Sequence, residues 1–241
     1  MQSILKTIQE RHSVRMPFDP ERPIAKEELR QILEAARWAP TAHNMQNFEI
    51  IVVDDRKVLH ELGKVKRTVS EAFIRENYEQ LSFTEEELLR RRVGILGTNF
   101  PPSWRTPGVK PIPEEGGSRL LPACPTLLVV LYDPARRAPA SEGDFLGAIS
   151  LGCMTENLWL AASSLGIDFH VVSSLANAPA EAEVKRILAI PAHLKIVFGI
   201  RLGYASAPPR YLRVRRDIGD FCHHNRFGTK GMDGRTQGSP T

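Results

Sequence analysis

The chain lacks the long apolar runs and the cysteine pairs that mark membrane and secreted proteins. No run approaches the roughly eighteen apolar residues of a membrane-spanning helix. The N-terminus has no apolar stretch typical of a secretory signal, and the three cysteines form no C-x-x-C pair, which suits reduced thiols. The composition therefore predicts a cytoplasmic protein that does not enter a membrane.

A large excess of charge of one sign is also missing. The chain has 32 lysine and arginine residues against 28 aspartate and glutamate residues, a net charge of +4. Basic clusters occur at residues 90–92, 136–137 and 213–216, but no aromatic residues interleave with them as a platform for stacked bases would require. We expect no nucleic-acid partner and interpret the clusters as solvated surface or as a small phosphate site.

Several common active-site motifs are absent. The sequence has no G-x-G-x-x-G or G-x-x-x-x-G-K-[ST] loop and no G-x-S-x-G turn, which argues against a Rossmann site, a P-loop and an α/β-hydrolase. Cys222, His223 and His224 are adjacent, but no second group of ligands is spaced to complete a metal site. We predict surface or subunit-contact histidines here, and no metal.

The periodicity of apolar residues predicts an α+β protein with about four strands. Residues 143–165 form a long stretch with little charge, which is typical of a central or interface helix. Further helices are predicted over residues 3–11, between Ile24 and Pro40, and over residues 179–188, and strands over residues 48–53, 126–132, 169–172 and 194–202.

The middle of the chain is different. Residues 56–93 are charged and look helical, with a break at residues 82–84 where Thr84 could cap a second helix. Residues 94–122 contain six prolines and five glycines among few periodic apolar positions. A loop of this length inside a compact domain is usually functional or mobile. We therefore predict that residues 64–122 form a lid, or an excursion that covers the substrate.

No internal repeat divides the chain, so we predict a single domain over residues 1–228. Beyond it, residues 229–241 contain one apolar residue, Met232, and are predicted to form a disordered tail.

Two polar clusters stand where regular structure ends. Arg11-His12-Ser13-Val14-Arg15 combines two guanidinium groups, an imidazole and a hydroxyl, and residues 39–46 add a hydroxyl and amides at a helix–strand junction. Such groups suit a phosphate and the polar edge of a heterocycle. The first cluster alone could equally be a helix end with solvated arginines. The second cluster, together with the basic residues 213–216, favours a ligand site.

These segments resemble the FMN-dependent nitroreductase family. The resemblance rests on four stretches that occur in the same order and are spread over more than half of the chain: Arg11–Arg15, Ala35–Val53, Glu156–Ile167 and Gly203–Gly228. It implies a homodimer of α+β subunits, each with a central, mostly antiparallel sheet flanked by helices. It also implies FMN at two sites in the dimer interface, NAD(P)H as co-substrate, and a C-terminal extension that crosses to the partner subunit.

The resemblance further implies roles for single residues. Arg11, Ser13 and Arg15 would contact the phosphate, the ribityl chain and the N1/C2 carbonyl edge of FMN, with His12 beside them. Arg15 would also act as the catalytic residue that stabilises the reduced flavin. The phosphate would be held by Arg213 and Arg215, with Arg216 able to replace one of them, and the flavin would be lined from the partner subunit by Pro40, Thr41, Ala42 and Asn44.

Two positions depart from the family's pattern. Asn44-Met45-Gln46-Asn47-Phe48 stands where many relatives have Asn-x-Gln-Pro-Trp, so the packing beside the flavin differs. Ser173 and Ser174 stand where many relatives have two glycines near flavin N5. A backbone amide of this pair could still reach N5, while the hydroxyls could donate a hydrogen bond or obstruct the substrate.

The reaction that the resemblance implies is ping-pong. NAD(P)H passes hydride to N5 of FMN and leaves, and an electron-poor acceptor such as a nitroaromatic, a quinone or another conjugated compound is reduced next. Two alternatives stay open. The same fold and flavin could serve substrate desaturation, dehalogenation or flavin fragmentation, or the chain could be a non-enzymatic flavin-binding protein.

Overall fold

The computed structural model describes residues 3–68, 86, 90, 115–139, 142–205, 207, 215 and 217–230. It divides the chain into two compact units, the first with residues 1–70 and 112–209, the second with residues 71–111 and 210–241. The single domain over residues 1–228 stays a prediction.

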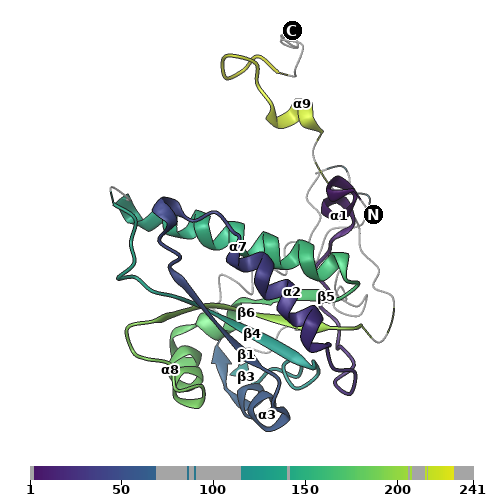
Figure 1. Cartoon of the computed structure of the whole chain (residues 1–241), viewed down its shortest axis with the longest axis vertical. Helices are drawn as coiled ribbons and strands as arrows, with labels where there is room; N and C mark the ends of the chain where they lie inside the picture. Colours follow the sequence, from purple (N-terminus) through teal and green to yellow (C-terminus); the bar gives the residue numbers. More distant parts are fainter. Residues whose placement is uncertain are drawn as a thin grey trace. The chain divides into compact units, whose positions relative to one another are not determined.

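A four-stranded antiparallel sheet forms the centre of the first unit (Figure 1). Its strands, in the order β1-β4-β6-β5, are Phe48–Val53, Thr126–Tyr132, Lys195–Gly203 and Asp168–Val172. Strand β4 is buried along its whole length because both of its faces are covered. The α+β class and the four strands predicted from the sequence are confirmed, each strand to within one residue.

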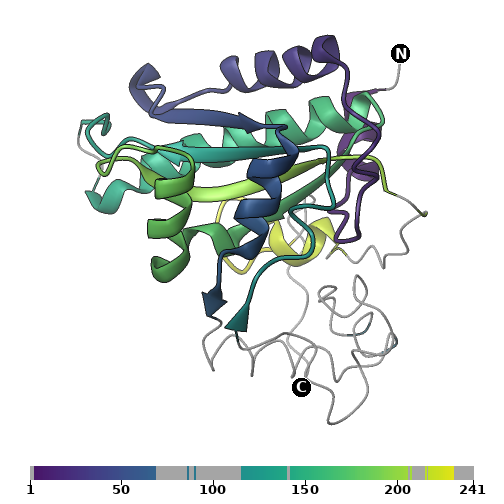
Figure 2. The ribbon, with the colours of Figure 1, turned by 90° about the horizontal axis from the view of Figure 1, so that it is seen from below.

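Helices cover the sheet on both faces (Figures 1 and 2). They are α2 (Lys26–Arg37) and α7 (Phe145–Ser164) on one face, and α3 (Arg56–Lys64) and α8 (Ala178–Ile187) on the other. Leu158 of α7 and Leu59 of α3 are fully buried, one in each of the two core layers. With the short helix α1 (Ile4–Glu10), these helices lie where the sequence predicts them.

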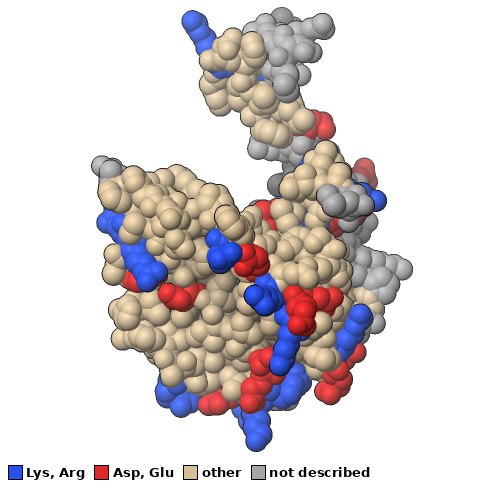
Figure 3. Space-filling view, in the orientation of Figure 1, with Lys and Arg blue, Asp and Glu red and all other residues tan. Residues whose placement is uncertain are grey.

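Helix α7 is covered along only one face within this unit. Phe145 and Ile149 are 69% and 46% exposed, and Figure 3 shows few charged side chains over this helix. By length and composition alone α7 could cross a membrane, but Met154 and Leu158 are buried in the core layer, as in the core helix of a soluble protein. An exposed apolar stripe of this kind is typical of an interface.

The chain leaves the core after α3 and returns beside the point where it left. Strand β2 (Arg67–Thr68) pairs antiparallel with β3 (Glu115–Gly116). The prediction of helix throughout residues 56–93 is therefore wrong at residues 65–68, because the carbonyl oxygen of Gly63 accepts the N–H of Ser118 (2.8 Å) instead of continuing the helix. Residues 86 and 90 are helical, and Thr84 lies outside the described residues.

Gly117 sits at the base of this two-stranded pair. A methyl group added to it would overlap the carbonyl oxygen of Gly63, which is backbone and cannot turn aside. We expect Gly117→Ala to lower the free energy of unfolding by about 1–3 kcal/mol, measured by chemical denaturation. Gly219→Ala is the control, since a methyl group there meets nothing described within 4 Å. An unchanged free energy for Gly117→Ala would contradict the close approach.

The second unit is described over a short helix and a tight turn. After α9 (Ile218–Phe221) the chain folds back, so that His223 pairs with Lys230 and its Nδ1 accepts the N–H of Gly228 at 2.9 Å. The His223 ring stacks on Phe227, with the ring centroids 4.3 Å apart. This turn extends two residues past residue 228, where the tail was predicted to begin, and residues 231–241 lie outside the described part.

Candidate functional site

The first polar cluster runs beside strand β5. The N–H of Val14 donates to the carbonyl oxygen of Phe169 (2.9 Å), and Ser13 and Phe169 form a parallel bridge. Val14 is fully buried and anchors the segment, while the side chains on either side of it, Ser13 and Arg15, are half-buried. The Ser13 hydroxyl makes no hydrogen bond to the described residues, so it is available to a ligand.

Arg11 is held against helix α7. Its Nε donates to Glu156 Oε1 at 2.6 Å, and its guanidinium lies 4.9 Å from the centroid of the Trp159 ring. Trp159 Nε1 donates in turn to the carbonyl oxygen of His12 at 3.2 Å. A ligand anion at Arg11 would therefore share the guanidinium with a carboxylate that already neutralises it.

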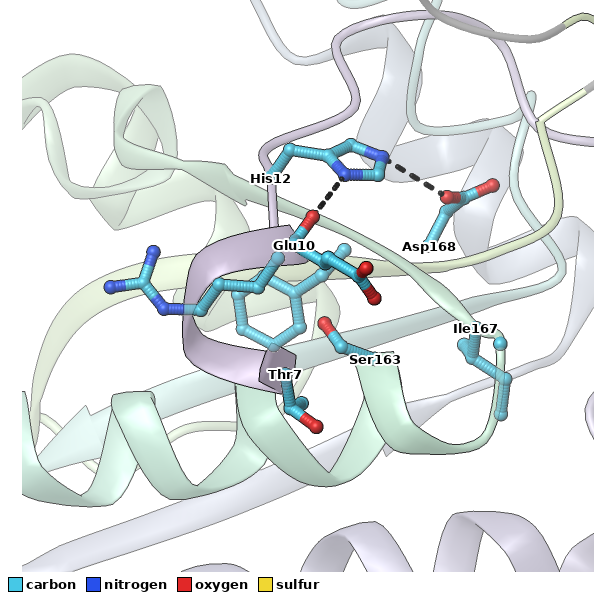
Figure 4. A pocket seen from close by; sticks show the side chains of 9 residues that line it. Thr7, Glu10, His12, Ser163, Ile167 and Asp168 are labelled. Atoms are coloured by element: carbon cyan, nitrogen blue, oxygen red, sulfur yellow. Dashed lines mark hydrogen bonds and ion pairs between the residues drawn. The ribbon is translucent and has the colours of Figure 1, made fainter. Parts of the chain in front are cut away.

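His12 faces a small cavity between α1, the end of α7 and the start of β5 (Figure 4). Its Nδ1 donates to the carbonyl oxygen of Glu10 at 3.0 Å, and its Nε2 lies 3.8 Å from Asp168 Oδ1. The cavity measures about 230 Å³, below the usual range for pockets that enclose an organic ligand. This cavity alone is too small to be a complete cofactor site.

Arg15 is a half-buried cation with no carboxylate partner among the described residues. Burial lowers the pKa of its guanidinium, although an arginine stays charged in proteins at ordinary pH. A desolvated charge without a counter-ion is costly. An anionic or strongly polar ligand group would relieve that cost.

A buried imidazole lies close to this cation. Burial, together with smaller contributions from the charges of Arg201 and Arg15, lowers the pKa of His170 to about 3. His170 and Arg201 face each other across the β5–β6 ladder, with Arg201 Nη1 3.0 Å from His170 Nδ1. His170 is therefore neutral at ordinary pH, and the positive charge here comes from the two arginines.

The second polar cluster forms a strained loop before β1. Three of its residues other than glycine have left-handed backbone, namely His43 (φ 50°), Asn44 (φ 54°) and Gln46 (φ 46°), and the first two belong to the 3₁₀ turn η1 (Ala42–Asn44). Such conformations persist where surrounding contacts fix them, often at ligand sites. Thr41 Oγ1 accepts the N–H of Gln46 at 3.2 Å, and Pro40 and Asn44 are exposed.

The two clusters contact different parts of helix α7. The N–H of Ala42 donates to Ser150 Oγ (3.0 Å), whereas the His12 carbonyl is held by Trp159. These two helix positions are nine residues apart, which corresponds to about 13 Å along the axis. One copy of the chain therefore keeps the clusters apart along the helix.

Ser173 and Ser174 lie directly beyond the end of β5, in the short 3₁₀ turn η4 (Ser173–Ala176) that Leu175 anchors in the core. Ser173 is exposed and Ser174 half-buried, and neither hydroxyl bonds to a described residue. Of the arginines predicted to hold the phosphate, Arg213 lies outside the described residues and Arg215 is exposed in the second unit.

A family model described as "Nitroreductase family" matches residues 8–204. The chain belongs to this family. The match covers three of the stretches that carried the resemblance in the sequence, Arg11–Arg15, Ala35–Val53 and Glu156–Ile167, and only the first two residues of Gly203–Gly228.

Two curated relatives show how far this nitroreductase-family chain matches known enzymes. An NADPH-dependent oxidoreductase of Staphylococcus haemolyticus is 24% identical over 192 residues, covering 80% of this chain and 61% of that protein. The NADPH-flavin oxidoreductase of Vibrio harveyi is 28% identical over 101 residues, covering 42% of this chain and 41% of that protein. The chain thus spans less than two thirds of the length of these relatives.

Solved structures confirm the nitroreductase fold. A nitroreductase with bound FMN from Bacteroides fragilis is similar with a TM-score of 0.57 at 22% identity, over 94% of this chain and all of that one. The NADPH:FMN oxidoreductase of Vibrio harveyi in complex with NAD⁺ gives a TM-score of 0.58 at 20% identity, over 96% and 80% of the two chains.

Sequence reasoning missed two buried residues beside the first polar cluster, His170 and Arg201. Each occurs in a strand that is otherwise mainly apolar, which is the one signal the sequence offers. Their partnership depends on the pairing of β5 with β6, and strand order cannot be seen in the sequence. The first polar cluster and Ser173 both lie next to strand β5. The second polar cluster instead contacts helix α7, nearer to the N-terminus of that helix.

Proposed function

We propose that this protein is an FMN-dependent oxidoreductase, which passes hydride from NAD(P)H through N5 of bound FMN to an electron-poor acceptor such as a nitroaromatic, a quinone or another conjugated compound. The observation that carries the proposal is Arg15, a half-buried cation without a described carboxylate partner, in a chain of the nitroreductase family. The names of the relatives, which contain FMN, flavin and NADPH, support it.

The donor groups present fit a flavin nucleotide. Arg15 would place its charge at the polar edge of the ring system, where negative charge grows on reduction, and thereby act as the catalytic residue. Ser13 would donate to the ribityl chain, and Arg11 would bind while sharing its charge with Glu156. Backbone amides at Ser173 and Ser174 would approach N5, and Arg213 and Arg215 would hold the phosphate.

We further propose that the site is completed in a homodimer. The apolar stripe of α7, with Phe145 and Ile149 exposed, would be covered by the second copy. The partner's loop would bring residues 40–44 to the cofactor, because one copy separates the two clusters along α7. The C-terminal extension of each subunit would cross to the other. A cytoplasmic location, without membrane or nucleic-acid partners, belongs to the same proposal.

We propose that residues 64–122 determine which electron acceptor the protein reduces. Their two ends are held together by the β2–β3 pair, so the segment leaves and re-enters the domain at one place. It would form a lid over the flavin within a single domain of residues 1–228.

The test is an anaerobic titration of the purified protein with NADPH and NADH, followed by a panel of acceptors. We expect a yellow protein whose flavin absorbance near 450 nm is bleached by NAD(P)H and returns on addition of a nitroaromatic or a quinone. A colourless protein that takes up no added FMN would refute the proposal. Bleaching by one organic substrate but not by NAD(P)H would indicate desaturase, dehalogenase or related chemistry. Bound FMN without turnover would indicate a binding protein.

A further inference from the structure

Arg201 is buried in the core although it carries a charge. It lies in β6, has no exposed surface, and none of its hydrogen-bond partners among the described residues is a carboxylate. Its Nε has no hydrogen-bond partner there. Burying an arginine in this way costs free energy, so the residue needs an explanation beyond packing.

The guanidinium of Arg201 joins three separate pieces of chain. Its Nη2 donates to the carbonyl oxygens of Met16 (2.9 Å) and Ala123 (3.1 Å), and its Nη1 donates to Nδ1 of His170 (3.0 Å). Because a guanidinium has no acceptor atom, Nδ1 must accept, and the proton of the neutral His170 lies on Nε2. The Phe18 ring covers the guanidinium at 4.3 Å from its centroid.

Two of these pieces matter for the proposed site. Met16 follows Arg15 directly, so its carbonyl fixes the end of the first polar cluster. Ala123 lies where the chain returns from the excursion into β4, and its carbonyl oxygen also accepts the N–H of Phe18 at 2.9 Å. The neighbouring carbonyl oxygens of Pro122 and Cys124 are held by Arg56 of α3, at 2.8 and 3.0 Å.

We propose that Arg201 is a positioning residue, which locks the Arg11–Met16 segment, the returning end of the excursion and His170 into one arrangement, and so sets the place of Arg15. This inference rests on the proposed function, because the position of Arg15 matters for FMN binding only if FMN binds beside Arg15. A planar fork with several donors can hold three acceptors at once. An apolar side chain of the same size would remove the Arg201 donor from the Met16 carbonyl and from His170 Nδ1, and would leave the Ala123 carbonyl with only the N–H of Phe18.

The test compares Arg201→Met, Arg201→Lys and a control, Val129→Ala, in the full-length protein. Val129 is fully buried in the core layer that contains Phe18 and Cys124, but it contacts the core only through apolar atoms. Each variant is measured for the dissociation constant of FMN, for amide hydrogen exchange at Val14 and Phe18, and for global stability by denaturation.

We expect Arg201→Met to raise the dissociation constant of FMN at least tenfold and to speed exchange at Val14 and Phe18 at least tenfold. Val129→Ala should change both less than threefold, even where its loss of stability is as large. Arg201→Lys keeps the charge and part of the bonding, so it should recover part of the FMN affinity. If Arg201→Met does not fold, the comparison of Arg201→Lys with Val129→Ala tests the proposal instead. We then expect a three- to tenfold loss of FMN affinity in Arg201→Lys and a smaller loss in Val129→Ala.

Equal effects of the arginine and valine variants, or wild-type exchange at Val14 and Phe18 in the arginine variants, would overturn the proposal. If the wild-type protein binds no FMN, the proposed function fails, and the exchange rates alone decide whether Arg201 positions the segment.

Discussion

Replacing Arg15 with alanine should weaken FMN binding about thirtyfold while leaving the FMN-free protein at least as stable as the wild type. A charge-assisted hydrogen bond contributes about 2 kcal/mol, which corresponds to this loss of affinity. In the absence of a ligand the half-buried guanidinium faces no described carboxylate, so its removal relieves a desolvation cost. A residue that binds the ligand should lower FMN affinity but not stability when it is removed, whereas a residue that holds the fold should lower stability as well.

Fluorescence titration with FMN and chemical denaturation of the FMN-free protein measure the two effects. Arg15→Lys keeps the charge and should retain most of the affinity. Arg22→Ala is the matched control, since Arg22 is an exposed arginine a few residues along the chain that stacks on Tyr204, 3.5 Å from the ring centroid. Unchanged FMN affinity in Arg15→Ala would exclude this residue from the binding site.

Acidification from pH 6.5 to pH 4 should cost on the order of 3 kcal/mol of stability through His170 alone. Burial lowers the pKa of His170 to about 3 in the folded protein, with Arg201 of β6 and Arg15 of the first polar cluster contributing, whereas a free histidine titrates near 6.5. Between these values the unfolded chain binds a proton that the folded protein does not. The contribution is therefore constant above pH 6.5, and stability is lost as the pH falls toward 3.

Denaturation at several pH values between 7.5 and 4 measures this loss, and His170→Asn provides the comparison. The amide oxygen of asparagine can accept the hydrogen bond from Arg201, and the amide does not titrate. Carboxylates elsewhere act alike in both proteins, so the difference between the two curves isolates His170. If the stability curves of the two proteins run parallel with pH, the His170 side chain is not the buried, neutral imidazole described above.

The longer helices and strands could be predicted from the sequence because apolar residues recur wherever an element faces the core, and their spacing shows which kind of element it is. Strand β4 is apolar without interruption since it is covered on both faces, and α2 shows a helical stripe since only one side of it meets the sheet. The β2–β3 pair could not be predicted in this way. Each of its strands has two residues, too few for a period, and they are brought together from opposite ends of the excursion.

The site was predictable in its parts but not in its assembly. Arg15 could be chosen by its chemistry and by the resemblance, but that no described residue supplies it with a carboxylate partner depends on the folded surroundings. The left-handed backbone at Gln46 has no signal in the sequence, because glutamine is not among the residue types enriched in that conformation. His170 and Arg201 become partners only through the pairing of β5 with β6.

The β2–β3 pair marks a place where one segment of the chain can be replaced by another. Because two short strands hold the chain ends side by side, the segment between them can be exchanged for one of another length without moving β1 or β4. The entropic cost is small, since doubling the length of a loop adds only about 0.6 kcal/mol. Under the proposed function, acceptor preference would then change by replacement of this one segment, while the residues proposed to bind FMN stay the same.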